Sequence, residues 1–254
     1  MTGLYLPVTA MLFGLIMRGV AFEFRFKSSS RRHVWDTFFF VGSVVATFSQ
    51  GIMLGALVQG LEASNRLYTG GPFDWLTPFS IVCGFAMIIG YALLGSTWLI
   101  IKTEHTLQVW ARQVSKWMLT ALLVAMVVVT AFMYFSDIDA LEGWFSFPDL
   151  LYLAPMPIIV MLLFFIMRKD LKTEREYRPF LLTVALFLMG YIGVCFALFP
   201  YIVPYQMTIY EAAAADTSLS FMLIGACIML PIILSYTAFA YYTFKGKSDH
   251  NPMY

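Results

Sequence analysis

The chain has 254 residues, of which 60% are apolar and 12% are charged, and its formal net charge is +1. So large an apolar share excludes an ordinary soluble domain. A net charge near zero leaves no basic field that would attract nucleic acid. The composition therefore indicates a membrane protein with no nucleic-acid partner.

Seven apolar stretches divide the chain, each close to or above the ~20 residues needed to cross ~30 Å of hydrocarbon. They cover roughly 4–22, 37–61, 75–101, 117–135, 153–167, 179–203 and 220–244. Because a backbone in lipid must satisfy its own hydrogen bonds, such stretches cross as helices. The predicted fold class is all-α: a polytopic membrane helical bundle with seven transmembrane helices.

The sixteen Lys and Arg residues lie almost entirely in alternate loops. Four lie in 25–32, three in 102–116, five in 168–178 and two in the tail, whereas the intervening loops hold only Arg66. By the positive-inside rule, the basic loops and the C-terminus are cytoplasmic and the N-terminus of this chain lies outside. Such a start usually follows an upstream helix, so we expect the reading frame before Met1 to encode a further apolar helix.

Small residues recur every four positions in the second stretch, at Ser43, Thr47, Gly51 and Gly55. A stripe of this kind lets a neighbouring helix approach closely. Stripes of small residues are common in membrane bundles, so this one predicts helix packing and not chemistry.

Polar groups inside the bilayer are costly to keep, and they are the candidates for function. Arg18 interrupts an apolar run and is followed by Glu23, and Asp36 precedes the second stretch. Arg18 either snorkels to the headgroups or turns into the bundle to pair with a carboxylate. Asp36 is read more readily as the N-cap of a helix than as a proton carrier. These three residues are the candidates for a proton path or an intramembrane charge.

The three histidines, His33, His105 and His250, all fall outside the centres of the apolar stretches. A haem in a membrane bundle normally takes at least one axial histidine from within the hydrocarbon. The residues also form no metal-binding set and no catalytic triad. Alone, the sequence therefore predicts a polytopic subunit that binds no haem or metal and has no catalytic residues.

Several segments resemble subunit II of the cytochrome bd-type quinol oxidases, above all RGVAFEFR at 18–25 and GPFDWLTPF at 71–79. The ending IMLPIILSYTAFAYYTFKGK at 228–247 is also similar, and YEAAAADTSLSFMLIG at 210–225 resembles the shorter, cyanide-insensitive branch. The likeness runs along essentially the whole chain. Its front differs, because a typical subunit II begins with another helix that is absent here.

The resemblance implies eight spanning helices in two four-helix bundles. In this chain, 1–112 would be an incomplete first bundle of three spans and 113–254 a second bundle of four. It also implies a heterodimer with subunit I, which carries haems b and d and the quinol site. The expected function is that of a non-haem subunit in a respiratory quinol:dioxygen oxidoreductase of the bacterial inner membrane. It would support subunit I and contribute to a proton or oxygen path, with quinone and lipid as further contacts.

Three other interpretations remain open from the sequence. A stand-alone transporter or channel fits the hydropathy, although the spans lack the midplane carboxylate that ion-coupled transporters commonly keep. A purely structural scaffold is the second alternative, against which only Arg18 argues. The third is that the short chain is a fragment without function of its own.

Overall fold

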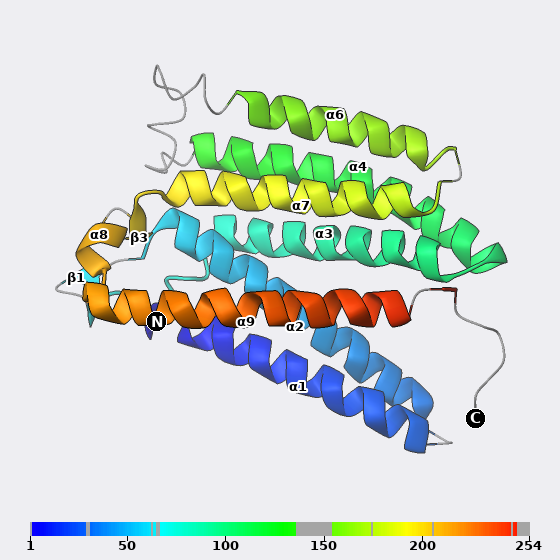
Figure 1. Cartoon of the computed structure of the whole chain (residues 1–254), viewed down its shortest axis with the longest axis horizontal. Helices are drawn as coiled ribbons and strands as arrows, with labels where there is room; N and C mark the ends of the chain where they lie inside the picture. The colour runs from blue at the N-terminus through cyan, green and yellow to red at the C-terminus, as the bar shows by residue number, and fades with distance from the viewer. Residues whose placement is uncertain are drawn as a thin grey trace.

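The computed structural model describes residues 2–28, 31–61, 63–64, 67–135, 154–173, 175–204, 206–244 and 246–247. Long helices dominate these parts of the chain, and they run roughly side by side along one axis (Figure 1). They are α1 (Tyr5–Lys27), α2 (Arg32–Gln59), α3 (Pro78–Lys102), α4 (His105–Phe135), α6 (Pro155–Asp170), α7 (Tyr177–Leu198) and α9 (Asp216–Thr243). The fold class predicted from the sequence is thereby confirmed.

Six of these helices, all except α6, are long and apolar enough to cross a membrane. The helix α6 has 16 residues and matches the predicted stretch 153–167, whose first residue lies outside the described part of the chain. Each observed helix extends beyond its predicted apolar stretch at one of its own ends. The helix α4 begins at His105, well before the predicted 117, so the predicted boundary between bundles at residue 112 falls inside this helix.

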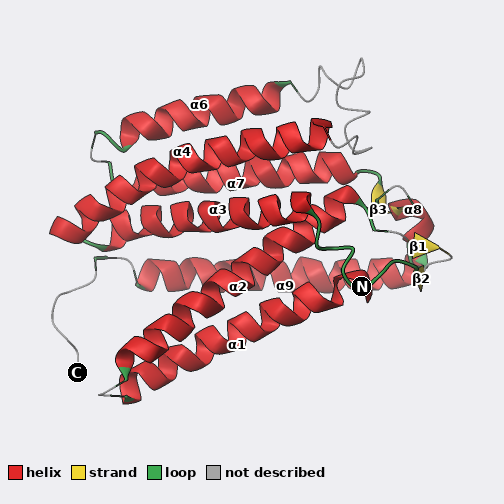
Figure 2. Ribbon diagram, turned by 180° about the vertical axis from the view of Figure 1, so that it is seen from behind, coloured by secondary structure: helices red, strands yellow, loops and turns green. Residues whose placement is uncertain are grey.

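Short elements lie at one end of the bundle. They are the helical turn η1 (Thr2–Leu4), the strand pairs β1 (Ala63–Ser64) with β2 (Leu67–Tyr68) and β3 (Tyr201–Val203) with β4 (Met207–Thr208), and α8 (Ile209–Ala212). Both pairs are antiparallel. The connections after α1, α3 and α6 and the C-terminus lie at the opposite end (Figures 1 and 2). We call this the basic end, since it carries the basic loops.

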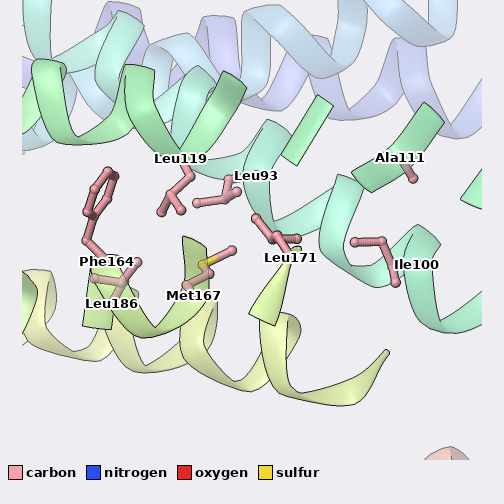
Figure 3. Close-up of a cluster of buried hydrophobic side chains, with 8 residues drawn as sticks. All are labelled: Leu93, Ile100, Ala111, Leu119, Phe164, Met167, Leu171 and Leu186. Carbon is pink, nitrogen blue, oxygen red and sulfur yellow. The ribbon is translucent and has the colours of Figure 1, made fainter. Parts of the chain in front are cut away.

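The helices α3, α4, α6 and α7 share one apolar core, drawn in Figure 3. Its buried side chains are Leu93, Ile100, Ala111, Leu119, Phe164, Met167, Leu171 and Leu186. Hydroxyl groups inside this core are satisfied locally: Ser115 donates to the Ser96 hydroxyl over 2.9 Å, and Thr183 donates to the Pro179 carbonyl. This core holds the four helices as one unit, which crosses the predicted division into two bundles.

The helix α2 lies between α1 and α3 and contacts both through glycine. A Cβ atom at Gly14 of α1 would lie 2.7 Å from the Gly42 carbonyl oxygen of α2. On the other side, a Cβ at Gly51 would lie 2.6 Å from the Cys83 carbonyl oxygen of α3. The absence of side chains at these points is what allows the three backbones to meet.

Candidate functional site

The α1–α2 pair brings three of the charged residues of RGVAFEFR and the following helix onto facing surfaces. Arg18 and Arg25 lie seven residues apart and so share one face of α1. The guanidinium carbon of Arg18 lies 5.4 Å from the centre of the Phe39 ring of α2. Nε of Arg25 donates to Oδ1 of Asp36, one turn of α2 away from Phe39. Arg18, Arg25 and Asp36 therefore lie along one seam.

Arg18 is exposed at the surface of the chain, and among the described residues no carboxylate forms an ion pair with it. The Arg18 guanidinium lies instead over the face of the Phe39 ring, where the ring quadrupole attracts its positive charge. Among the described residues, no partner carboxylate of the kind considered above reaches it. A polar partner for Arg18 would have to come from outside the described residues.

Two of the sequence interpretations change at Glu23 and Asp36. Glu23 lies about 140° around α1 from Arg18, so it points away from the seam, and its side chain is exposed. The interpretation of Asp36 as an N-cap is wrong, because α2 begins at Arg32 with Arg31 as its N-cap residue. Hydropathy marked only the apolar part of α2, and its polar first turn is helical as well.

The predicted packing stripe divides into two parts. Gly51 and Gly55 are buried against α3, whereas Ser43 and Thr47 are only half-buried. The Ser43 hydroxyl donates to the Phe39 carbonyl of its own helix. The residues of α2 that meet α1 most closely are Gly42 and Ala46, which the four-residue pattern missed. Gly42, Ala46 and Ser49 lie at helical spacing and form a second face of small residues, which the sequence alone could have revealed.

The GPFDWLTPF segment folds into a hydrogen-bonded turn that starts α3. Oδ2 of Asp74 accepts from the Gly71 amide over 2.6 Å and from the Tyr68 hydroxyl over 3.1 Å. The Thr77 hydroxyl caps α3 by accepting from the Ser80 amide, and it donates to Oε1 of Gln59 over 2.6 Å. The motif thus ties the start of α3 to the last turn of α2. Its role in this chain is structural.

A buried carboxylate, Asp170, ends α6 at the basic end, and the sequence reasoning missed it. Its side chain is 5% exposed and lies between two cations: Nε of Arg178 is 3.2 Å from Oδ2, and Nε of Arg175 is 3.8 Å from Oδ1. Removing one partner of such a buried pair typically costs ~3–5 kcal/mol, and less here because both arginines reach solvent. Asp170 therefore fixes the turn between α6 and α7.

Glu176, just before α7, connects α4 and the C-terminal tail. Its Oε1 accepts from Nε2 of Gln108 over 2.9 Å and from Nζ of Lys247 over 2.8 Å. The hydrogen bond from Lys247 is the main reason that the pKa of Glu176 lies below its ordinary value of 4.5. The same bond raises the pKa of Lys247 above 10.5. The pair joins segments that are far apart in sequence.

The described histidines lie at helix starts. His33 is in the first turn of α2, and His105 is the first residue of α4 with a φ of 51°. His250 lies outside the described residues. Neither described histidine is at mid-depth in a span, where an axial haem ligand would be needed. The described residues of α1, α2 and the basic end offer charged and small side chains that contact neighbouring helices.

Together, the seven membrane-length or near-membrane-length helices and the sparse polar seam define a polytopic helical membrane subunit. A profile of the family described as "Cytochrome bd terminal oxidase subunit II" matches residues 1–244. The chain belongs to this family, and the resemblance noted in the sequence is confirmed.

Curated relatives agree with the family match. The chain is 26% identical to the "Probable cytochrome oxidase subunit 2" of Haemophilus influenzae, an alignment that covers 98% of this chain and 75% of that protein. It is 24% identical to the "Cytochrome bd ubiquinol oxidase subunit 2" of Bacillus subtilis, with 98% and 75% covered. It is also 25% identical to the "Cytochrome bd-I ubiquinol oxidase subunit 2" of Escherichia coli, with 97% and 74% covered.

The fold is similar to that of a solved chain from the bd oxidase of Geobacillus thermodenitrificans, with a TM-score of 0.72. The two share 14% sequence identity, and the match covers 94% of this chain and 73% of the other. At this identity the likeness establishes the fold. None of the comparisons supports the transporter alternative.

Proposed function

We propose that this chain is the non-haem subunit of a quinol:dioxygen oxidoreductase complex. It would pair with a haem-bearing subunit I and would not be catalytic on its own. The observation that carries the proposal is the family match across residues 1–244, together with curated relatives that are subunits of ubiquinol oxidases.

The positions of the described histidines support the placement of the cofactors in the partner subunit. Haems b and d require axial ligands inside the bilayer, and His33 and His105 stand at helix starts. The residues here therefore do not fit a haem, and we derive no redox step in this subunit. Subunit I would oxidise quinol and reduce dioxygen, while this chain supplies an apolar surface against which subunit I packs.

The seam on α1 and α2 is the proposed contribution of this chain to a proton or charge path. Arg18 is exposed at the surface of the chain, so a second subunit that covers α1 could provide its polar partner. The side chains of Asp36 and Arg25 at the end of the seam are half-exposed, at 48% and 46%, and are accessible to water. Glu23 lies off this line, so its participation would depend on the partner.

We further propose that the chain resides in a bacterial cytoplasmic membrane, with the basic end and the C-terminus in the cytoplasm. The support is the charge distribution: fourteen of the sixteen Lys and Arg residues lie in the loops and the tail that meet at the basic end. The N-terminus of this chain would then face outward.

Co-purification tests the assignment. The full chain, tagged at its C-terminus and expressed with its neighbouring genes, should retain a second subunit whose reduced visible spectrum shows haems b and d. The complex should consume oxygen when a quinol is added. The same chain purified without the partner should show neither the haem spectrum nor oxygen uptake.

A transporter would give a different result. Isolation of the tagged chain as a stable species without a haem-bearing partner, from cells that contain bd oxidase, would contradict the proposal. A haem spectrum from the chain alone would contradict the assignment of the haems to subunit I.

A further inference from the structure

A positively charged hollow lies between α4 and α6, away from the seam on α1 and α2. It has a volume of about 200 Å³ and opens beside three cations, Lys116 of α4, Arg168 of α6 and Lys172 just after α6. Gln113, Trp117 and Thr120 of α4 add polar and aromatic groups to its wall. Its floor is the shared core, through the buried side chains of Leu119 and Leu171.

The three cations are not neutralised by nearby carboxylates. In the described parts of the chain, none of Lys116, Arg168 and Lys172 forms an ion pair, and Arg168 lies 6.0 Å from the centre of the Phe164 ring. The buried carboxylate nearest in sequence, Asp170, is already held between Arg175 and Arg178. Within the described residues, the hollow therefore presents three cations that no carboxylate pairs, a charge that complements an anion.

The depth of the hollow matches the membrane interface. Lys116 and Trp117 stand where the apolar stretch of α4 begins, and Arg168 directly follows the apolar stretch of α6. The part of α4 from His105 to Lys116 extends about 16 Å beyond this level. Tryptophan and basic residues with apolar stems gather at the level of the lipid headgroups, and the Trp117 ring is 66% exposed.

An apolar groove continues from the hollow along α4 towards the middle of the bilayer. It has a volume of about 480 Å³ and lies between α3 and α4, and Trp117 and Thr120 line both spaces. Small residues line it, Ala121 and Ala125 on α4 and Ala86 on α3. Phe85 and Val128 line its walls further along.

The two spaces form one surface because their α4 residues repeat at helical spacing. Apart from Leu119 at the floor, the lining residues of α4 from Gln113 to Val128 recur at steps of three and one, which places them on a single face. The apolar part from Trp117 to Val128 is about 16 Å long. This length is close to half of the ~30 Å hydrocarbon core, that is, to one leaflet.

We infer that this surface binds one anionic phospholipid, with its phosphate headgroup among Lys116, Arg168 and Lys172 and an acyl chain in the groove between α3 and α4. The charge complements a phosphate, the position is at headgroup level, and the apolar groove has the length of an acyl chain in one leaflet. Basic pockets between helix ends at the membrane surface are known to suit such headgroups. Free phosphate would use the cations but not the groove.

Native mass spectrometry tests this site on the full chain purified in detergent with any subunit that accompanies it. Phosphatidylglycerol is the anionic probe and phosphatidylcholine of the same acyl chains is the reference. Each of Lys116→Gln, Arg168→Gln and Lys172→Gln should weaken phosphatidylglycerol binding about fivefold, and the triple variant about a hundredfold. Phosphatidylcholine binding should stay unchanged. Lys169→Gln removes a charge from the same end of α6 outside the hollow and should change the affinity less than about twofold.

The groove has its own variant. Ala125→Phe should fill the groove and weaken the binding of both lipids about tenfold or more, and millimolar inorganic phosphate should not displace phosphatidylglycerol from the wild type. Triple-variant affinity equal to that of the wild type, or equal losses in Lys169→Gln, would overturn the assignment of the headgroup. Unchanged binding in Ala125→Phe, or full displacement by phosphate, would reduce the site to a free-anion site and overturn the lipid proposal.

Discussion

Among the described residues, three cations lie over aromatic rings, and two of them, Lys102 and Arg168, are near the ends of helices. Arg18 lies over Phe39, Lys102 over Trp98 at 5.3 Å, and Arg168 over Phe164 at 6.0 Å. A long side chain can keep its charge at the headgroups while its stem lies in lipid, and a ring beneath the charge adds attraction. Lys102 also donates to the carbonyls of Phe244 and Gly246, at the end of α9. Arg18 differs from it in lying far from its helix end.

The depth of Arg18 makes it the most informative residue to change. It lies about 14 Å along α1 from Lys27, so its charge is well inside the span, in the half nearer the basic end. A charge left unpaired there costs on the order of 3 kcal/mol. We expect Arg18→Lys and Arg18→Leu to lower oxygen consumption by the assembled complex at least tenfold, or ~1.4 kcal/mol in barrier, with the haem content retained. Lysine fails because it cannot form a planar fork.

Lys27→Leu is the matched control, since it removes a cation at the end of the same helix. It should leave oxygen consumption and assembly unchanged. Normal turnover of both Arg18 variants at normal assembly would leave Arg18 as a snorkelling anchor and remove it from the proposed path.

The pair Glu176–Lys247 should make docking of the tail depend on pH. The pKa of Glu176 is lowered from 4.5, so its stabilising contribution is present above pH 4.5 and is lost as the pH falls through the lower value in the folded protein. The pKa of Lys247 is raised from 10.5, so its contribution is lost only as the pH rises above that value. We expect slow amide exchange at Gly246 and Lys247 between these limits, measured by mass spectrometry with correction for intrinsic rates.

Glu176→Gln provides the comparison for the tail. It should give faster exchange at residues 246–247 at neutral pH and the same exchange as the wild type at pH 3. Equal protection of the two proteins at pH 7 would show that Lys102 alone holds the tail, through its hydrogen bonds to the carbonyls of Phe244 and Gly246.

At the scale of elements, hydropathy predicted the helices well and their ends poorly. An apolar stretch of about twenty residues can only be a helix in lipid, so the spans follow directly. The polar first turns of α2 and the long extension of α4 from His105 are helical for reasons of packing and hydrogen bonding that hydropathy does not measure. Because hydropathy detects only the apolar part of α2, it places the helix start at Asp36, whereas the helix begins at Arg32.

The small-residue faces show a similar limit. The sequence could identify Gly51 and Gly55 as small residues at helical spacing, but the identity of the neighbouring helix depends on tertiary contacts. The close approach of α1 and α2 at Gly14 and Gly42 falls on the small-residue face of 42, 46 and 49, but spacing alone does not tell which helix that face meets. The same holds for Asp170, whose partners Arg175 and Arg178 reach it only because the chain turns back after α6.

The contact between α1 and α2 gives a prediction for stability. In Gly42→Ala, the added Cβ would lie 2.6 Å from the Gly14 carbonyl oxygen, a backbone atom that can move only if the helices separate. We expect the free energy of unfolding in mixed detergent micelles to fall by about 1–3 kcal/mol, as for overpacked cores. Gly19→Ala on α1 is the control, because nothing lies within 4 Å of its added Cβ.

In the control, alanine should be neutral or slightly stabilising, because it favours the helix over glycine by up to about 1 kcal/mol. Equal destabilisation by Gly42→Ala and Gly19→Ala would mean that helix flexibility, and not the close contact, determines the effect.

For the whole molecule, the arrangement of helices brings most of the basic residues, which are spread along the sequence, together at one end. The loops after α1, α3 and α6 and the start of the tail lie at the basic end (Figure 2). Lys102, Glu176 and Lys247 connect the end of α3, the start of α4 and the segment before α7 with the tail. The charge pattern predicted that these loops share a side of the membrane. The particular pairs, such as Lys102 with the end of α9, could not be predicted, because their members are distant in sequence.

The orientation of the molecule is open to direct measurement. We expect reporter fusions after residues 28, 103 and 173 and in the tail to report a cytoplasmic location, because these positions lie among fourteen of the sixteen Lys and Arg residues. Fusions in 136–152, which lies outside the described residues, and in 204–219 should report the outer side. Both segments lack Lys and Arg and contain acidic residues, among them Asp149 and Glu211. A cytoplasmic signal from either would reverse the assignment and place the lipid site proposed between α4 and α6 in the outer leaflet.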